Sequence, residues 1–181
     1  AKLDLTDDKI DPRNGIRLET EINDILDKAS ETSDFYTMNS NLSTYVPILK
    51  SSTWGFNIFN SRTLMKKKAS TDREYLRNKI GLNCEGISDP NLKAQCIAAE
   101  NKVIDERVAV NTYGQAASLG GTQRLRSFPN GRFIAGNALF FGSEFRFNLT
   151  DERTFFNYYL LKGVRTNIQF ALFAETGTVV E

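Results

Sequence analysis

Few of the side chains that usually carry protein chemistry occur in this sequence of 181 residues. It contains no histidine, which removes the usual general base, the usual zinc ligand and every Ser-His-Asp or Cys-His arrangement. Its two cysteines, Cys84 and Cys96, lie close together in a polar segment. They could form a disulfide in an oxidising compartment, or remain two thiols in a cytosolic protein. We therefore expect no catalytic residue, metal site or cofactor here.

Carboxylates cluster near the start of the chain, in the stretch DLTDDKIDPRNG at 4–15. Such a cluster is one way to bind calcium. An EF-hand loop that began at Asp4 would, however, need glycine in place of Lys9 and glutamate in place of Gly15. Because Asn14-Gly15 is typical of a tight turn that leads into a strand, the pattern favours a turn over a metal site.

Another chemically distinctive residue is Arg126, within LGGTQRLRSFPNGRF at 119–133. It stands between leucine, serine and phenylalanine, in a run rich in glycine and turn formers. An ordinary exposed loop arginine is one interpretation. The other is an arginine that the loop carries to an acidic partner elsewhere in the fold, and this interpretation depends on which way the later strands face.

Overall charge and hydropathy exclude two classes of protein. With 23 basic and 22 acidic residues the net charge is +1, which is not the charge pattern of a nucleic-acid-binding protein. The chain has no apolar run long enough for a membrane-spanning helix, whereas a spanning strand, which needs only about 9–11 alternating residues, is not excluded. Since the chain opens on Ala1 without a signal sequence, we expect a mature product or a section of a longer protein.

Alternation of apolar and polar residues predicts long antiparallel strands. In 137–149, for example, Leu139, Phe141 and Phe145 lie on one side, and Glu144 and Arg146 on the other. Charges on the polar side and lengths beyond the usual 5–6 residues favour a membrane barrel around a water-filled lumen; a soluble β-sandwich is the alternative. We expect about six strands, one of them formed at the ends of the chain and the others at 15–28, 34–48, 52–64, 137–149 and 164–176.

Residues 66–110 break this alternation and predict a helical insert. Thr71 and Glu74 have the spacing of a capping box, and Asp89-Pro90 is a good start for a second helix. Cys84 and Cys96 are placed to join the two helices. The basic run at 66–68 is interpreted as a solvated face.

Five stretches of the chain, in this order, resemble the barrel domain of the bacterial surface antigen superfamily, which includes the BamA-like outer-membrane assembly factors and the two-partner secretion transporters. They are DLTDDKIDPRNGIRLETE, YVPIL, LGGTQRLRSF, GNALFFGSEFRFNL and VRTNIQFALFAETGTV. Most specific are a Gly-Gly run followed by an Arg-Gly-Phe-like tetrad, and a Phe-x-Asp-x-Gly-like strand motif that corresponds here to Phe173, Glu175 and Gly177.

In that family the tetrad arginine lies in the sixth extracellular loop, which folds back into the barrel, and it meets acidic residues on the two following strands. The resemblance implies that Arg126 is such a lumenal anchor, paired with Glu144 and Glu175, with Phe128 packing beside it. The alternation independently puts both glutamates on polar faces. The chain departs from the family at Ser127, where glycine is usual, and at Glu175, where aspartate is usual.

The resemblance thus implies an all-β fold in which 1–181 forms the middle-to-late strands of a 16-stranded antiparallel transmembrane β-barrel, with 66–110 as an extracellular helical insert. It implies a non-enzymatic protein of the bacterial outer membrane that assembles, inserts or translocates client proteins. Outer-membrane lipid, client outer-membrane or secreted proteins and accessory periplasmic lipoproteins would be its partners. The alternatives are a barrel that carries a fused patatin-like lipase or one secreted substrate, and a soluble β-sandwich binding module.

Overall fold

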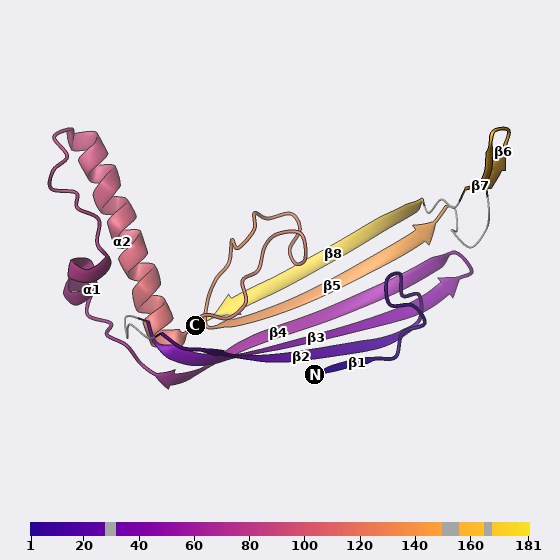
Figure 1. Ribbon diagram of the computed structural model, residues 1–181, viewed down its shortest axis with the longest axis horizontal. Helices are drawn as coiled ribbons and strands as arrows, with labels where there is room; N and C mark the ends of the chain where they lie inside the picture. The colour runs from indigo at the N-terminus through magenta and orange to yellow at the C-terminus, as the bar shows by residue number, and fades with distance from the viewer. Residues whose placement is uncertain (28–31, 150–155, 165–167) are drawn as a thin grey trace.

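One long antiparallel sheet dominates the computed structural model, which describes residues 1–27, 32–149, 156–164 and 168–181 (Figure 1). Its six strands follow the order β1-β2-β3-β4-β5-β8. They are β1 (Lys2–Asp4), β2 (Gly15–Ile25), β3 (Asp34–Leu49), β4 (Ser52–Lys67), β5 (Asn137–Asn148) and β8 (Gln169–Val180). A separate hairpin consists of β6 (Phe156–Tyr158) and β7 (Leu161–Val164).

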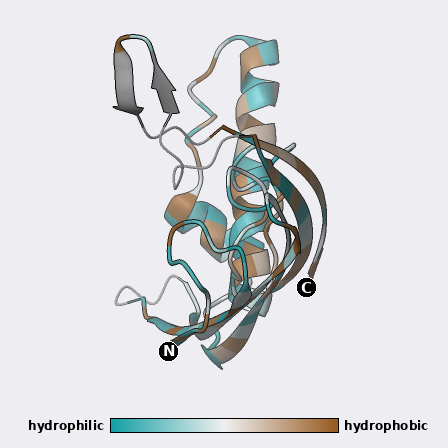
Figure 2. Cartoon of the chain, turned by 90° about the vertical axis from the view of Figure 1, so that its right-hand side faces the viewer, coloured by the Kyte–Doolittle hydropathy of each residue, from teal (hydrophilic) through white to brown (hydrophobic). Residues whose placement is uncertain are grey.

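The predicted antiparallel sheet is confirmed, and its strands lie close to the expected ranges. The sixth strand is β1, at the N-terminal end of the chain. β4 continues to Lys67, three residues beyond the expected end, and β8 occupies 169–180 where 164–176 was expected; residues 28 and 165–167 of the expected strands lie outside the described residues. The sheet is curved (Figure 2) but open, with β1 and β8 at its edges, so it is not a closed barrel.

The register of the strands gives the sheet one apolar and one polar face. Leu18, Leu42, Ile58 and Phe141 are successive partners across four strands, and all four side chains are exposed. The next row carries Glu19, Asn41, Phe59 and Phe140 on the opposite face. Because a one-residue slip would exchange the faces, the pairing from β2 to β8, whose register shifts lie only at the two ends of the β3–β4 pair, fixes this separation.

No second sheet covers the apolar face within the described part of the chain. A soluble β-sandwich buries such a face against a second sheet at a distance of about 10 Å. Here instead large side chains along it stay open, among them Ile22, Val46, Trp54, Phe170 and Leu172. The sandwich alternative therefore has no support in the described residues.

The acidic N-terminal stretch forms a turn, as its sequence indicates. The Asp7 carboxylate accepts hydrogen bonds from the backbone N–H groups of Arg13 and Asn14, both at 2.9 Å. Asp8 in the same way accepts from the backbone of Ile10 at 2.7 Å. Donation by the Asn14 N–H, and then by Arg13, holds the pKa of Asp7 below its ordinary value. The carboxylates thus stabilise the backbone of 5–14 instead of converging on a cation.

Two helices, α1 (Arg73–Ile80) and α2 (Pro90–Tyr113), lie between β4 and β5 and project from one end of the sheet (Figure 1). The expected start of α2 is confirmed: Asp89 accepts from the N–H groups of Asn91 and Leu92. The expected cap of α1 is wrong by one residue. Asp72, not Thr71, accepts from the N–H groups at the start of that helix, since Asp72 immediately precedes the first helical residue, Arg73.

The segment between β4 and β5 that carries the helices begins at residue 68, two residues after the expected start, because β4 includes Lys66 and Lys67. α2 runs to Tyr113, three residues past the expected end at 110. A disulfide between Cys84 and Cys96 joins the segment after α1 to the first turns of α2. Neither helix combines the length and the apolar character that crossing a membrane would require in the described part of the chain.

A buried polar cluster fastens α2 to the sheet. Asn111, fully buried, accepts the Ser33 N–H on Oδ1 at 3.1 Å and donates from Nδ2 to the Ser70 carbonyl at 2.7 Å. The Ser33 hydroxyl donates to the Asn111 carbonyl and accepts from the Ala69 N–H. One side chain therefore joins the β2–β3 connection, the start of the insert and the last turn of α2, which gives the insert a fixed base.

We expect Asn111→Ala to lower the free energy of unfolding by about 1–3 kcal/mol, because it leaves the buried Ser33 N–H without its partner and removes the hydrogen bond to the Ser70 carbonyl. Equilibrium unfolding in denaturant measures this loss. The matched control is Asn101→Ala on the same helix, whose amide makes an exposed hydrogen bond to Arg77 and which should cost less than about 1 kcal/mol. Equal losses in the two variants would contradict the fastening role.

Candidate functional site

The loop that carries Arg126 folds back over the polar face of the sheet. Leu119 and Phe133 close its base through two backbone hydrogen bonds of 2.9 and 3.0 Å. Gly120 and Gly121 follow with φ near +105° and +109°, a backbone region that side chains disfavour, and a Cβ on Gly120 would lie 2.3 Å from the Pro129 carbonyl oxygen. The Gly-Gly run is thus required by the turn.

An apolar cluster holds the loop against β4 and β5. Its buried members come from the loop and from the polar face beneath it, and are Phe59, Ala116, Leu119, Leu125, Ala138 and Phe140. On the β8 side, a Cβ on Gly177 would lie 2.9 Å from Leu119 Cδ1 and 3.2 Å from the Leu139 carbonyl oxygen. Gly177, which the resemblance singled out, therefore leaves the space in which the loop sits.

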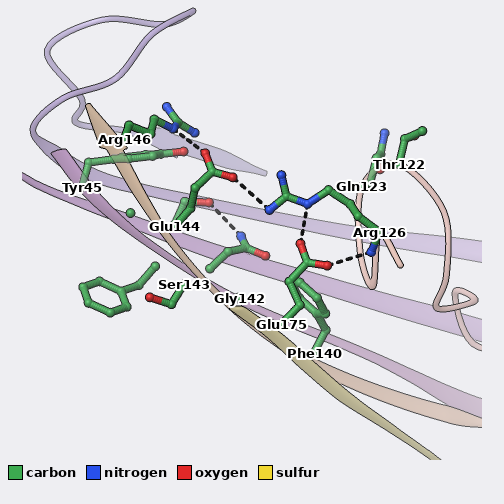
Figure 3. Close-up of a pocket in the computed structure, with 14 residues that line it drawn as sticks. Tyr45, Thr122, Gln123, Arg126, Phe140, Gly142, Ser143, Glu144, Arg146 and Glu175 are labelled. Atoms are coloured by element: carbon green, nitrogen blue, oxygen red, sulfur yellow. Dashed lines mark hydrogen bonds and ion pairs between the residues drawn. The ribbon is translucent and has the colours of Figure 1, made fainter. Parts of the chain in front are cut away.

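Arg126 bridges the two predicted carboxylates (Figure 3). Its Nε lies 2.6 Å from Glu175 Oε1, and its Nη2 lies 2.9 Å from Glu144 Oε2. The Arg126 backbone N–H also donates to Glu175 Oε2 at 2.7 Å. The Glu175 side chain is 7% exposed, so one nearly buried carboxylate receives both a charged and a backbone donor.

Strand register explains why one guanidinium reaches both acids. Glu144 is opposite Phe173, and Glu175 is opposite Gly142, so the carboxylates are diagonal neighbours on one face. Diagonal neighbours lie about 7–8 Å apart, a gap that the planar fork of donors of an arginine can span. Gly142 leaves room beside Glu175, and the Phe173 ring lies 3.8 Å from the Arg126 Cζ, under the guanidinium.

The electrostatics of the site keep the arginine charged. Burial alone would lower the pKa of Arg126, but the hydrogen bonds and negative charges of Glu175 and Glu144 raise it above its ordinary value. The side chain of Arg126 remains 34% exposed, so the site is shielded from solvent only in part.

One expectation about the loop is wrong. Phe128 does not pack beside the guanidinium: its ring makes an edge contact with Phe133 at 5.1 Å, and Phe173 takes the place expected for it. Ser127, which stands where the family has glycine, does not adopt a positive φ; in this loop the non-glycine residue with positive φ is Leu125, at 54°. That conformation turns the Leu125 side chain into the apolar cluster.

Sequence reasoning missed three contacts around the loop. Arg124 places its guanidinium 3.5 Å from the centre of the Phe59 ring. Arg146 donates to Glu144 Oε1 at 2.6 Å and lies 3.7 Å from Asp11 of the N-terminal turn. The i, i+2 spacing of Glu144 and Arg146 was a usable signal, because such residues share a face of a strand. Nothing in the sequence indicated Asp11.

Arg126, Arg146, Glu144 and Glu175 together form a clamp of paired charges. A cavity of about 200 Å³ beside it is lined by the clamp residues and by Tyr45, Asn57 and Gln123. In the described ranges, no three His, Cys, Asp or Glu side chains group together as metal ligands would. The geometry supports mechanical fixation of the loop, with every charge of the clamp held by an opposite one.

Comparisons of the chain with protein-family models, with curated proteins and with solved structures find no match. The resemblance to the bacterial surface antigen superfamily therefore stays a prediction. It depends on the order of the motifs, and the positions of Arg126, Glu144 and Glu175 agree with what it implies.

We expect Arg126→Gln to lower the free energy of unfolding by about 2–3 kcal/mol, because it leaves the Glu175 carboxylate without a charged partner. This value lies between the loss measured for exposed ion pairs and that for buried ones. Arg126→Lys should recover only part of this loss, since an ammonium group lacks the fork that spans both acids. Chemical denaturation gives both values. Arg73→Gln, which removes an exposed ion pair with Asp105, is the control and should cost less than about 1 kcal/mol.

Proposed function

We propose that this chain forms part of a transmembrane β-barrel in a bacterial outer membrane, and that the barrel assembles, inserts or translocates client proteins. The observation that carries the proposal is the contrast between the two faces of the sheet. One face is open and mostly apolar, although Ser40, Asn60 and Arg62 lie on it; the other carries charged side chains paired with one another under an inward-folded loop. Lipid outside and water inside would produce this contrast.

The length of the apolar face supports the proposal. Along β3 it runs from Tyr36 to Ile48, which at about 3.3 Å per residue is about 40 Å. A strand tilt of about 45° reduces that span to about 28 Å, close to the hydrocarbon thickness of a bilayer. Strands of the usual 5–6 residues would be too short for this.

Polar groups on the apolar face support it as well. The Trp54 indole N–H donates to the Ser143 hydroxyl at 2.8 Å, so two polar groups satisfy each other across neighbouring strands. In lipid, where no water replaces a missing partner, such pairing is needed. The β8 edge has no partner in the described residues, so the proposed barrel requires further strands there, sixteen in all by the resemblance.

The assembly role comes from the resemblance. In that family the inward loop with its arginine is a shared feature of barrels that handle client proteins, and the clamp found here has the corresponding residues. The disulfide agrees with an oxidising location such as the periplasm or the cell surface. The proposal assigns Arg126, Glu144 and Glu175 to holding the loop inside the lumen, and the apolar face to contact with lipid.

The position in the membrane can be tested with the only tryptophan of the chain, Trp54. In protein reconstituted into vesicles, lipid with brominated acyl chains should quench its fluorescence strongly and aqueous iodide only weakly, because the ring lies on the outer face. A double variant, Trp54→Phe with Tyr45→Trp, moves the reporter to the polar face and should reverse this order. Strong quenching by iodide alone in the native protein would support a soluble sheet instead.

The assembly role can be tested with a charge exchange in the intact protein: Arg126→Glu, Glu175→Arg and both together. Each single variant should reduce the heat-modifiable migration of the folded barrel and the insertion of client proteins in cells. The double variant should recover only part of both, because Glu144 then faces a like charge. Native behaviour of all three variants would make Arg126 an ordinary loop residue.

A further inference from the structure

The charges on the polar face continue beyond the clamp. Glu144 uses Oε2 for Arg126 and Oε1 for Arg146, and Arg146 Nη1 in turn lies 3.7 Å from Asp11 Oδ1. The other Asp11 oxygen, Oδ2, is 3.3 Å from Arg13 Nη2. Starting from Glu175, negative and positive groups therefore alternate through six side chains, and Figure 3 shows Arg146 on the side of Glu144 away from Arg126.

This chain of charges crosses the sheet. Asp11 lies in the turn 5–14, which leads into β2, whereas Arg146 belongs to β5, and in the order of the sheet β3 and β4 lie between them. The turn thus reaches over two strands on the curved polar face, and its own Pro12 is buried. The Arg126 loop and the turn 5–14 fold onto the polar face from opposite ends of the strands. They meet at Glu144 and Arg146, which are adjacent on one face of β5.

The turn is stiff enough to transmit a displacement. Its backbone is closed by the Leu5 N–H to the Ile16 carbonyl at 2.9 Å and by the Asp7 N–H to the Asn14 carbonyl at 3.0 Å. Arg17 ties it to the sheet by donating to Asp4 at 3.0 Å and to the Lys9 carbonyl at 3.0 Å. A displacement of Asp11 would therefore move the backbone of the whole turn.

We propose that Arg146 is a positioning residue that couples the Arg126 loop to the N-terminal turn, so that the two segments hold or leave the polar face together. Its guanidinium fixes Glu144 Oε1 and so aims Oε2 at Arg126, while its other end holds Asp11. Loss of Arg126 would then loosen a turn that it does not touch. The inference concerns contacts within the chain and does not depend on the proposed function.

Hydrogen exchange on the intact, folded protein tests this coupling. Arg126→Gln should speed exchange of the Leu5 and Asp7 amides by about threefold or more, since local opening of the turn becomes easier. Arg146→Gln should do the same, and the double variant should exchange no faster than Arg146→Gln alone, because the connection is already broken. Amides of the central β3–β4 pair report global opening, so their acceleration measures the loss of overall stability; the coupling is read from turn amides that exchange by local opening, faster than this global rate. Arg73→Gln, an exposed charge loss on α1, is the control.

Reciprocity gives an independent readout if Arg146→Gln fails to fold. Asp11→Asn, which removes the charge that Arg146 meets in the N-terminal turn, should speed exchange of the Leu119 and Phe133 amides at the base of the loop. Acceleration confined to the loop in Arg126→Gln, or additive effects in the double variant, would overturn the proposal. Neither lipid nor client enters the measurement, so its failure is distinct from failure of the proposed function.

Discussion

A single guanidinium that bridges carboxylates on two neighbouring strands fixes the long connection between α2 and β5 on the polar face of the sheet. The rest of the loop is arranged around this bridge. The two glycines turn the chain inward, Leu125 and Leu119 pack into the cluster beneath it, and Gly177 leaves the space. Because Glu175 is nearly buried, it needs a charged donor, and the loop supplies it.

Strand periodicity made most of this predictable. Side chains alternate across a strand, so the pattern that placed Glu144 and Glu175 on polar faces also fixed their orientation once the strands paired antiparallel. What alternation cannot supply is which residues are opposite each other. The diagonal placement of the two acids follows from the β5–β8 register, and only the structure gives that register.

Two of the misses share a physical cause: each depended on a choice between residues of similar capacity. Thr71 and Asp72 can both cap a helix, and the backbone selects Asp72. Phe128 and Phe173 can both stack on an arginine, and Phe173 is held opposite Glu144 on a strand, whereas Phe128 sits in the loop beside Phe133. The contact between Asp11 and Arg146 spans most of the sequence and crosses two strands, so local patterns carry no signal for it.

The two faces of the sheet satisfy their polar groups in different ways. On the polar face, each charged side chain of the clamp is paired with one of opposite sign, and water can still reach the partly exposed Arg126. On the outer face the indole of Trp54 is satisfied by one hydroxyl, and apolar side chains surround it. On the exposed face of a sheet in water, polar groups need no partner within the protein, because solvent hydrogen-bonds to them. Such a sheet would also not leave so many large apolar side chains exposed. On the function proposed above, lipid against the outer face would account for both observations.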